Sequence, residues 1–384
     1  MAVVDRCFFC TTPFQVVSAI ALESTFSGQA DLYIVDQFQG YKEIGERIRH
    51  EMVFRDVRYV EERKLQPWRF SHDQNSFYVH VMKVLAYFRG HELMRLINPE
   101  SDSYETIFIS SNAFTGRIAS SYLMKRYGTR IVLFDDGTGS YCNPGTIRNQ
   151  TMERRVRALA FGNKVLSVVP DRYLYSPELY RACGVLPQNC EIEQIPSWNE
   201  NEEVLSKLDR VFLYGEFMLP KAKAIAFESF ENEICSEEQY NVFLRCLDMI
   251  QDFCQIDGFS IKIHPRNAEG RLFYSQRYSL YEADNSVPFE IIIAHMNGFE
   301  GVTLITSFST AVFSPKIILN EEPVIILLYR IIGLENVVDS YSQKYIDCVR
   351  EMYKHDERVI VPETLDELRE ALESLRENDG SSFN

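Results

Sequence analysis

The sequence has no long hydrophobic run and no excess of positive charge. No stretch of the 384 residues approaches 18 consecutive apolar residues, so we expect no segment that spans a membrane. The 55 acidic residues outnumber the 40 Lys and Arg residues and leave a net charge of −15. Because phosphate binding needs a basic excess, this charge argues against nucleic acid as the main partner. Residues 1–7 lack the basic-then-apolar layout of a secretory signal, and we therefore expect a cytoplasmic protein.

Cysteines are scattered and show no pairing pattern. There are nine of them, an odd number, which is typical of reduced thiols in a cytoplasmic protein. Cys7 and Cys10 form a C-x-x-C motif, but no second Cys/His pair is present to complete a metal site. Since both lie in an apolar, strand-like segment, we interpret them as core residues rather than as redox or metal groups.

What the sequence has in quantity is material for hydrophobic cores, with 46% hydrophobic and 13% aromatic residues. The length favours two domains. Short apolar runs alternate with helical patterns, which predicts an α/β protein with parallel, doubly wound sheets. The predicted strands are 3–10, 31–35, 106–110, 130–134, 210–214, 259–264, 302–306 and 323–328.

The predicted helices separate these strands. Thr12 and Pro13 predict the start of a helix that ends near residue 23, and Thr364 with Glu367 forms a capping-box pattern before the last helix. Residues 186–208 are rich in Pro, Asn and Glu and show little periodicity, which favours a linker. The remaining helices are expected within 41–98 and at about 113–127, 236–254 and 289–295. The predicted division is an N-terminal domain 1–190, a linker 191–208, a C-terminal domain 209–362, and a terminal helix and tail 363–384.

Polar groups follow four of the predicted strands. Ile261 and Ile263 alternate with Lys262 and His264, which places the lysine and the histidine on one side of a strand that Pro265 ends. Ligands of open α/β sheets bind at the carboxyl ends of strands. Taken singly, each group has a simpler explanation, such as a solvated turn, a structural histidine or a helix cap. The four groups are Asp135-Asp136-Gly137, Gly215-Glu216, His264-Pro265-Arg266, and Ser307 to Thr310.

These groups also carry a family resemblance. Asp135-Asp136-Gly137, His264-Pro265 and Ser307/Ser309 resemble the D/E-D/E-G, H-P and serine motifs of bacterial sialyltransferases. Those enzymes adopt the GT-B fold, two facing Rossmann-like domains with a cleft between them. Residues 12–15 and 134–138 are similar to glycosyltransferase family 52, which includes lipooligosaccharide sialyltransferases and capsule enzymes. The resemblance covers most of the chain to about residue 330, and it departs where Phe308 interrupts what is often a Ser-Ser pair.

The resemblance implies an inverting, metal-independent sialyltransferase that needs no cofactor. It would move sialic acid from CMP-sialic acid to a terminal galactose of a lipooligosaccharide or capsule. Asp135 or Asp136 would be the general base, with Asp135 preferred because it holds the first acidic position of the motif. His264 would donate a hydrogen bond or a proton to the departing phosphate. The phosphate would be bound by Ser307, Ser309 and Thr310.

The resemblance and the positions of the strand ends also suggest further binding residues. On the donor side these are Gly215, Glu216, Lys262, Pro265, Arg266 and Glu290, the last of which resembles an acidic residue that holds the donor's ribose. On the acceptor side they are Thr12, Gln15, Ser111, Asn112 and Gly137, which turn and cap duties explain equally well. Glu216 and the Glu237-Glu238 pair are alternative bases, although the pair also suits the start of a helix.

Two other functions stay open at this stage. One is a GT-B transferase that uses another nonulosonic acid or a nucleotide-diphosphate sugar. The other is a non-catalytic glycan-binding or scaffold protein of the same fold. Further partner hypotheses are a homodimer and peripheral contact with the inner membrane through the basic-aromatic stretch 63–70, since Trp, Arg and Lys favour that interface.

Overall fold

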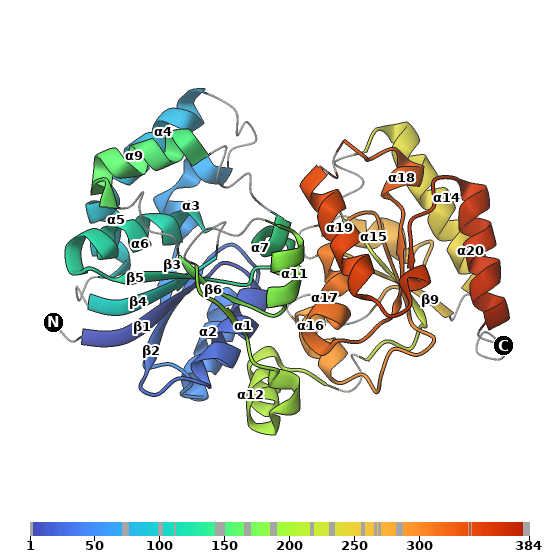
Figure 1. The fold of residues 1–384 in the computed structure, drawn as a ribbon, viewed down its shortest axis with the longest axis horizontal. Coiled ribbons are helices and arrows are strands. Elements are labelled where there is room, and N and C mark those ends of the chain that lie inside the picture. Colours follow the sequence, from blue (N-terminus) through green and yellow to red (C-terminus); the bar gives the residue numbers. More distant parts are fainter. Residues whose placement is uncertain are drawn as a thin grey trace. The chain divides into compact units, whose positions relative to one another are not determined.

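The computed structural model divides the chain into two compact units, unit 1 (Met1–Phe212) and unit 2 (Leu213–Asn384). Each unit contains its own parallel sheet covered by helices (Figure 1). The residues that the structure describes are 3–70, 77–98, 103–110, 113–142, 150–164, 170–184, 190–215, 219–229, 235–254, 258–264, 267, 270–281, 287–336, 338 and 340–378.

Unit 1 is built on a seven-stranded sheet with the order β3-β2-β1-β4-β5-β6-β7, in which all pairings are parallel. The order reverses between β1 and β4, so this is a doubly wound sheet with its topological switch point there. The strands are β1 (Val3–Cys10), β2 (Ala30–Val35), β3 (Asp56–Val60), β4 (Ser103–Ile109), β5 (Arg130–Phe134), β6 (Asp171–Leu174) and β7 (Ile192–Gln194).

Helices cover both faces of this sheet, with α1, α2 and α12 on one side and α5, α6 and α9 on the other (Figure 1). The first helix begins as its sequence predicts, because the Thr12 hydroxyl accepts a hydrogen bond from the Gln15 N–H at 3.2 Å and Pro13 follows the cap. The helices are α1 (Pro13–Glu23), α2 (Tyr41–His50), α3 (Glu62–Leu65), η1 (Pro67–Phe70), α4 (Phe77–Phe88), α5 (Gly90–Ile97), α6 (Phe114–Tyr127), α7 (Thr138–Cys142), α9 (Gln150–Phe161), α11 (Pro177–Ala182), η2 (Trp198–Glu200) and α12 (Glu202–Phe212).

Unit 2 is built on a five-stranded parallel sheet with the order β12-β11-β10-β8-β9. Its switch point lies between β8 and β10, as in flavodoxin-like sheets. The strands are β8 (Ala224–Phe227), β9 (Phe259–Lys262), β10 (Thr303–Thr306), β11 (Val324–Leu327) and β12 (Val359–Ile360).

The helices of unit 2 include the predicted terminal helix, which packs against α14. At its start the Thr364 hydroxyl accepts from the Glu367 N–H at 3.1 Å, and the Glu367 carboxylate accepts from the Glu363 N–H at 2.8 Å. The helices are α14 (Glu237–Cys254), α15 (Gly270–Ser275), α16 (Phe289–Ala294), η5 (Thr310–Phe313), α17 (Ser314–Leu319), α18 (Tyr329–Ile332), α19 (Ser340–Met352), η6 (Asp356–Arg358) and α20 (Leu365–Asn378).

The predicted fold class is therefore confirmed: this is an α/β chain with two consecutive, doubly wound, Rossmann-like domains. Most predicted strands are present with shifted ends. Within 41–98, expected to be mostly helical, the structure adds the strand β3. Cys7 and Cys10 are buried in β1 with free thiols whose pKa values burial raises, which confirms their interpretation as core residues.

Two predictions between the domains are wrong. Residues 191–208 are not a linker, because they contain β7, η2 and most of α12, all within unit 1. Residues 210–214 are not a strand, because 210–212 end α12. Val204, Leu208, Val211 and Phe212 recur at helical spacing and are buried, and α12 packs against α1 and α2. The unit boundary therefore lies at Phe212/Leu213.

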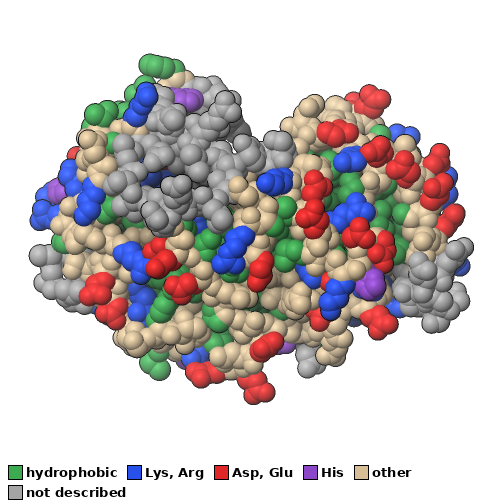
Figure 2. Space-filling model, in the orientation of Figure 1, with side chains coloured by type: hydrophobic (Ala, Val, Ile, Leu, Met, Phe, Trp, Pro, Cys, Tyr) green, Lys and Arg blue, Asp and Glu red, His purple; other side chains and the backbone are tan. Residues whose placement is uncertain are grey.

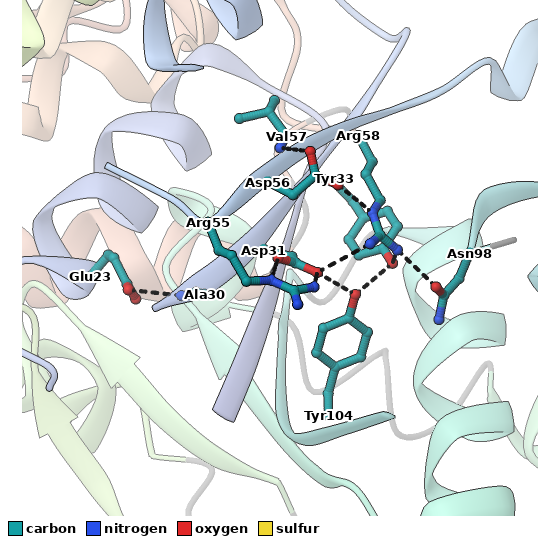
Figure 3. Close-up of polar contacts among 10 residues, drawn as sticks. All are labelled: Glu23, Ala30, Asp31, Tyr33, Arg55, Asp56, Val57, Arg58, Asn98 and Tyr104. Atoms are coloured by element: carbon teal, nitrogen blue, oxygen red, sulfur yellow. Dashed lines mark hydrogen bonds and ion pairs between the residues drawn. The ribbon is translucent and has the colours of Figure 1, made fainter. Parts of the chain in front are cut away.

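A buried charge near the amino ends of the unit 1 strands fastens β3 to the sheet (Figure 3). The Asp31 carboxylate of β2 accepts two hydrogen bonds from Arg55, at 2.7 and 2.6 Å, and one from the Tyr104 hydroxyl at 2.7 Å. Arg58 of β3 lies 3.6 Å from the same carboxylate and also bonds the Tyr33 hydroxyl. Because a buried carboxylate needs such partners, this cluster is a structural feature of the strand starts.

The described part of the chain contains no helix with both the length and the apolar character needed to cross a bilayer.

Candidate functional site

The carboxyl edge of the unit 2 sheet gathers polar residues from three neighbouring strands. His264 follows β9, Glu228 and Ser229 follow β8, and Ser307 to Ser309 follow β10. Since β8 lies between β9 and β10, these residues share one end of the sheet, at the switch point where ligands of such sheets bind. The structure thus brings His264 and the serine cluster to the same edge.

Glu228, which the sequence analysis missed, holds the turn that carries His264. One oxygen of its buried carboxylate accepts the His264 N–H at 2.8 Å, and the other accepts the Asn267 side-chain amide at 2.9 Å. The Asn267 N–H in turn donates to the His264 carbonyl at 2.9 Å. A signal was present in the sequence, because the apolar run 224–227 followed by Glu-Ser repeats the pattern of the other strand ends.

The serine cluster is organised around the buried Thr306 hydroxyl, another residue not singled out from the sequence. This hydroxyl lies 3.1 Å from the Ser229 hydroxyl and accepts the Ser309 N–H at 2.8 Å. The Ser309 side chain makes no cap hydrogen bond, and Thr310 is exposed. The Ser307 hydroxyl is fully buried and is one of nine buried side-chain polar atoms that have no hydrogen-bond partner within the described residues, whereas most buried polar groups in proteins are paired.

Two further donor-side candidates lie beside this edge. Lys262, the last residue of β9, is buried rather than solvated at the surface. Glu290, in the first turn of α16, is also buried and accepts a hydrogen bond from the Ser314 hydroxyl at 2.9 Å. Burial raises the pKa of Glu290, whereas the Ser314 hydrogen bond and the Lys262 charge lower it. Lys262 and Glu290 are therefore close enough to interact electrostatically.

The remaining donor-side residues are less informative. Gly215 does not follow a strand, because the predicted strand before it is the end of α12. Its neighbour Tyr214 stacks on the His295 ring, with the ring centroids 3.9 Å apart. Glu216, Pro265 and Arg266 lie outside the described residues.

In unit 1, the Asp135 carboxylate closes the turn after β5. It is only 1% exposed. One oxygen accepts the Gly137 N–H at 2.9 Å, and the other accepts the Tyr175 N–H at 3.2 Å and the Tyr141 hydroxyl. Burial raises the pKa of Asp135 to about 7, although these hydrogen bonds oppose the shift. The left-handed φ of +91° at Gly137 allows the chain to turn back over the carboxylate.

Asp136 is more accessible than Asp135. Its carboxylate is half-buried and accepts a hydrogen bond from the Ser140 hydroxyl at 2.8 Å, while the Ser140 oxygen accepts the Asp136 N–H at 2.9 Å. The greater exposure of Asp136 therefore favours Asp136 as the base, whereas the sequence motif favours Asp135.

The acceptor-side candidates that the structure describes serve the turn after β1. Thr12 caps α1, and the buried Gln15 side-chain oxygen accepts the Thr11 N–H at 2.6 Å. Sugar contacts by Thr12, Gln15 and Gly137 remain predictions. Ser111 and Asn112 lie outside the described residues.

Tyr175, which the sequence analysis missed, links the turn after β5 to α1 and η2. Its N–H bonds Asp135, and its hydroxyl lies 3.1 Å from both the Ser18 hydroxyl of α1 and the Trp198 indole nitrogen. No local pattern in the sequence indicates these contacts.

The stretch 63–70 does not present its tryptophan at the surface, although Lys64 is exposed. Trp68 is buried and packs edge-on against Phe114, with ring centroids 5.6 Å apart. Arg69 forms an ion pair with the buried Glu62 carboxylate. Trp68, on which the expected membrane contact mainly depended, therefore belongs to the core of unit 1.

Within the described residues, no group of three or more His, Cys, Asp or Glu side chains is arranged to hold a metal ion.

Fold and site together define the class: two Rossmann-like domains in one chain, the components of the GT-B fold, with polar residues at the carboxyl edge of each sheet. The sequence matches no protein-family model and no curated protein.

Solved structures give distant likenesses. MnaA of S. aureus with UDP is 12% identical, with a TM-score of 0.47 over 100% of this chain and 98% of that one. The wall teichoic acid polymerase TagF is 10% identical, with a TM-score of 0.43 over 97% and 83%. Os79 of O. sativa with UDP and deoxynivalenol-3-glucoside is 8% identical, with a TM-score of 0.44 over 98% and 95%. Likenesses this distant carry no argument about activity.

Proposed function

We propose that this chain is a cytoplasmic glycosyltransferase that moves sialic acid from CMP-sialic acid to a terminal galactose of a bacterial surface glycan. The observation that carries the proposal is the buried, unpartnered Ser307 hydroxyl at the β8/β10 switch point, on the sheet edge that also bears His264. Because the Ser307 side chain is 0% exposed, a phosphate oxygen would reach this hydroxyl only after a local shift of residues 307–309. It would then satisfy a group whose lack of a partner costs about 1–3 kcal/mol. The motif resemblance to bacterial sialyltransferases supplies the identity of the donor.

The donor would bind at the carboxyl edge of the unit 2 sheet. Its phosphate would accept hydrogen bonds from Ser307 and from Ser309, whose side chain makes no cap hydrogen bond. His264, on the turn that Glu228 holds, would donate to the bridging phosphate oxygen as the bond to the sugar breaks. Lys262 adds positive charge beside this edge, and a ribose contact by Glu290 is part of the proposal.

The reaction would be one displacement with inversion at the anomeric carbon. The acceptor hydroxyl oxygen forms the new bond to that carbon while the carbon–phosphate-oxygen bond breaks, and its electron pair leaves with CMP. The hydroxyl proton goes to a carboxylate. We assign this role to Asp136, since both oxygens of Asp135 already accept hydrogen bonds from the chain and its side chain is buried. No metal or cofactor takes part in this scheme.

Two assays test the proposal. In a thermal-shift series with CMP, UDP and GDP, we expect CMP to stabilise the protein most. Release of CMP from CMP-sialic acid should persist in EDTA, and lactose, N-acetyllactosamine and oligosialic acid then serve as trial acceptors. Preference for UDP or GDP with loss of turnover in EDTA would identify a diphosphate-sugar enzyme instead. If none of the three nucleotides stabilises the chain, the scaffold-protein alternative is favoured.

A further inference from the structure

Helix α4 is apolar on the side that faces solvent as well as on the side that faces the core. Val79 and Tyr87 are buried in the unit 1 core. Phe77, Val81, Leu85 and Phe88 are nevertheless exposed, and their spacing of four, four and three residues places them on one face of the helix. The exposed fractions of Phe77 and Phe88 are 84% and 55%.

The neighbouring helices carry two more exposed apolar residues. Helices α5 and α9 pack against α4 (Figure 1), and each adds one exposed leucine, Leu96 and Leu159. Eleven large hydrophobic side chains are exposed in the described part of the chain, and seven of them lie on these three helices. Such clustering marks an interaction surface rather than scattered surface residues. The seven, which we term the α4 patch, are Phe77, Tyr78, Val81, Leu85, Phe88, Leu96 and Leu159.

The α4 patch lies in a basic part of an acidic chain. Residues 77–97 and 150–161 contain six Lys and Arg residues and two Glu residues, whereas the whole chain has a net charge of −15. One of those acids, Glu153, accepts hydrogen bonds from Arg117, at 2.9 Å, and from the Tyr87 hydroxyl. Figure 2 shows Lys or Arg and His side chains beside hydrophobic ones over the part of unit 1 where α4 lies.

The charge discriminates between candidate partners. In a two-fold dimer the same face meets itself, so a second copy would bring two basic surfaces together, which like-charge repulsion opposes. A bilayer with anionic headgroups instead satisfies both features, because acyl chains accept the apolar side chains and the headgroups attract Lys and Arg. With 12 residues, α4 is about 18 Å long, which suits a helix lying in the interface and is too short to span.

We propose that the α4 patch docks unit 1 on an anionic lipid surface, with α4 lying in the plane of the headgroups. The proposal assigns membrane contact to the α4 patch instead of the stretch 63–70, whose tryptophan is buried. It does not rest on the proposed sialyltransferase activity.

Vesicle flotation tests the proposal. The full chain should float with vesicles of phosphatidylcholine mixed with phosphatidylglycerol, less with phosphatidylcholine alone, and less as salt rises. Replacing two exposed aromatic residues, Phe77→Ser with Phe88→Ser, should lower binding to the mixed vesicles by about tenfold or more. The matched control is Leu272→Ser with Phe273→Ser, which removes two exposed apolar residues of α15 in unit 2.

A second variant and a mass measurement complete the test. Lys83→Glu with Arg89→Glu keeps the apolar face and should lower binding only where anionic lipid is present. The proposal is overturned if the chain does not float with the mixed vesicles, or if the α4 and α15 variants float alike. It is also overturned if light scattering shows a dimer that the α4 variant dissociates, because the patch would then bind a second copy.

Discussion

Asp135 and Asp136 are neighbours in the sequence but occupy different environments. The sequence separates them only by their order in the motif, because burial and the contact with Tyr175 depend on how β6 lies beside β5. The structure makes Asp135 the residue that closes the turn and leaves Asp136 the more accessible carboxylate. Which aspartate takes the proton is therefore a structural question that the motif leaves open.

The first prediction separates the two roles. Asp136→Asn should lower transfer by about 10²- to 10⁴-fold, the usual worth of a general base, and leave the melting temperature nearly unchanged. Asp135→Asn should lower the melting temperature, because an amide cannot accept all the hydrogen bonds that converge on the carboxylate. Equal loss of transfer without loss of stability in both variants would contradict this division.

The second prediction concerns pH. The pKa of Asp135 is raised from 3.8 to about 7 in the folded chain, so the folded state binds the proton more tightly than the unfolded state. Its contribution to stability is therefore fully present below about pH 4 and is lost as pH rises through about 7. Other carboxyl groups have lowered pKa values and act in the opposite direction, so the test is the difference between the unmodified chain and Asp135→Asn. Urea unfolding should show that the free energy of unfolding of the unmodified chain, relative to the variant, declines by a few kcal/mol across this range. A pH dependence identical in the variant would rule out this assignment.

The third prediction concerns Glu228, which acts on His264 through the backbone. Glu228→Gln replaces one accepting oxygen with a donor that faces either the His264 N–H or the Asn267 amide. We expect turnover to fall about tenfold with little change in KM, and Glu228→Asp to recover part of it. A merely structural role would lower stability and leave the turnover of the folded fraction unchanged.

At the scale of the elements, the sequence predicts most of the apolar strands and misses several that are very short or carry charged residues. The first strand, the strand 130–134 and the helix from residue 237 stand out because their patterns extend over several residues. Strand β12 has two residues, too few for a periodic pattern. Strand β8 has four residues, as many as the predicted strands β9, β10 and β11, and it was overlooked although its apolar run stands in the sequence. Strand β3 carries Asp56 and Arg58, whose charges are paired in the fold in a way that the sequence does not reveal.

The same limits apply to the candidate site. His264, Ser307 and Asp135 were found because each follows a recognisable strand. Glu228 was missed because its strand was missed, and Tyr175 because its partners lie on α1, β5 and η2.

The fourth prediction tests α12, which the sequence suggested to be part of a linker and a strand. Leu208 is fully buried on its apolar face, so Leu208→Ala should lower the free energy of unfolding of unit 1 by about 2–5 kcal/mol. Leu205→Ala, on the half-buried side of the same helix, should cost clearly less. Denaturant unfolding of both variants measures this difference. If residues 202–212 were a linker, the two variants would lose the same small amount of free energy of unfolding.

At the scale of the whole molecule, two sheets of different topology stand one after the other in the chain, each with its own switch point. The proposed function assigns them different tasks, with the base in unit 1 and the nucleotide in unit 2. On this account CMP binding depends on the β8/β10 edge and is independent of Asp136.

The most direct test of that claim is calorimetric titration of CMP into the Ser307→Ala variant. The matched control is Ser260→Ala in β9, which also removes a buried hydroxyl without a hydrogen-bond partner. The account predicts that CMP binding weakens by about tenfold in Ser307→Ala, the worth of one hydrogen bond to a charged group, and is unchanged in Ser260→Ala. Unchanged CMP affinity in Ser307→Ala, or no CMP binding by the unmodified chain, would contradict it.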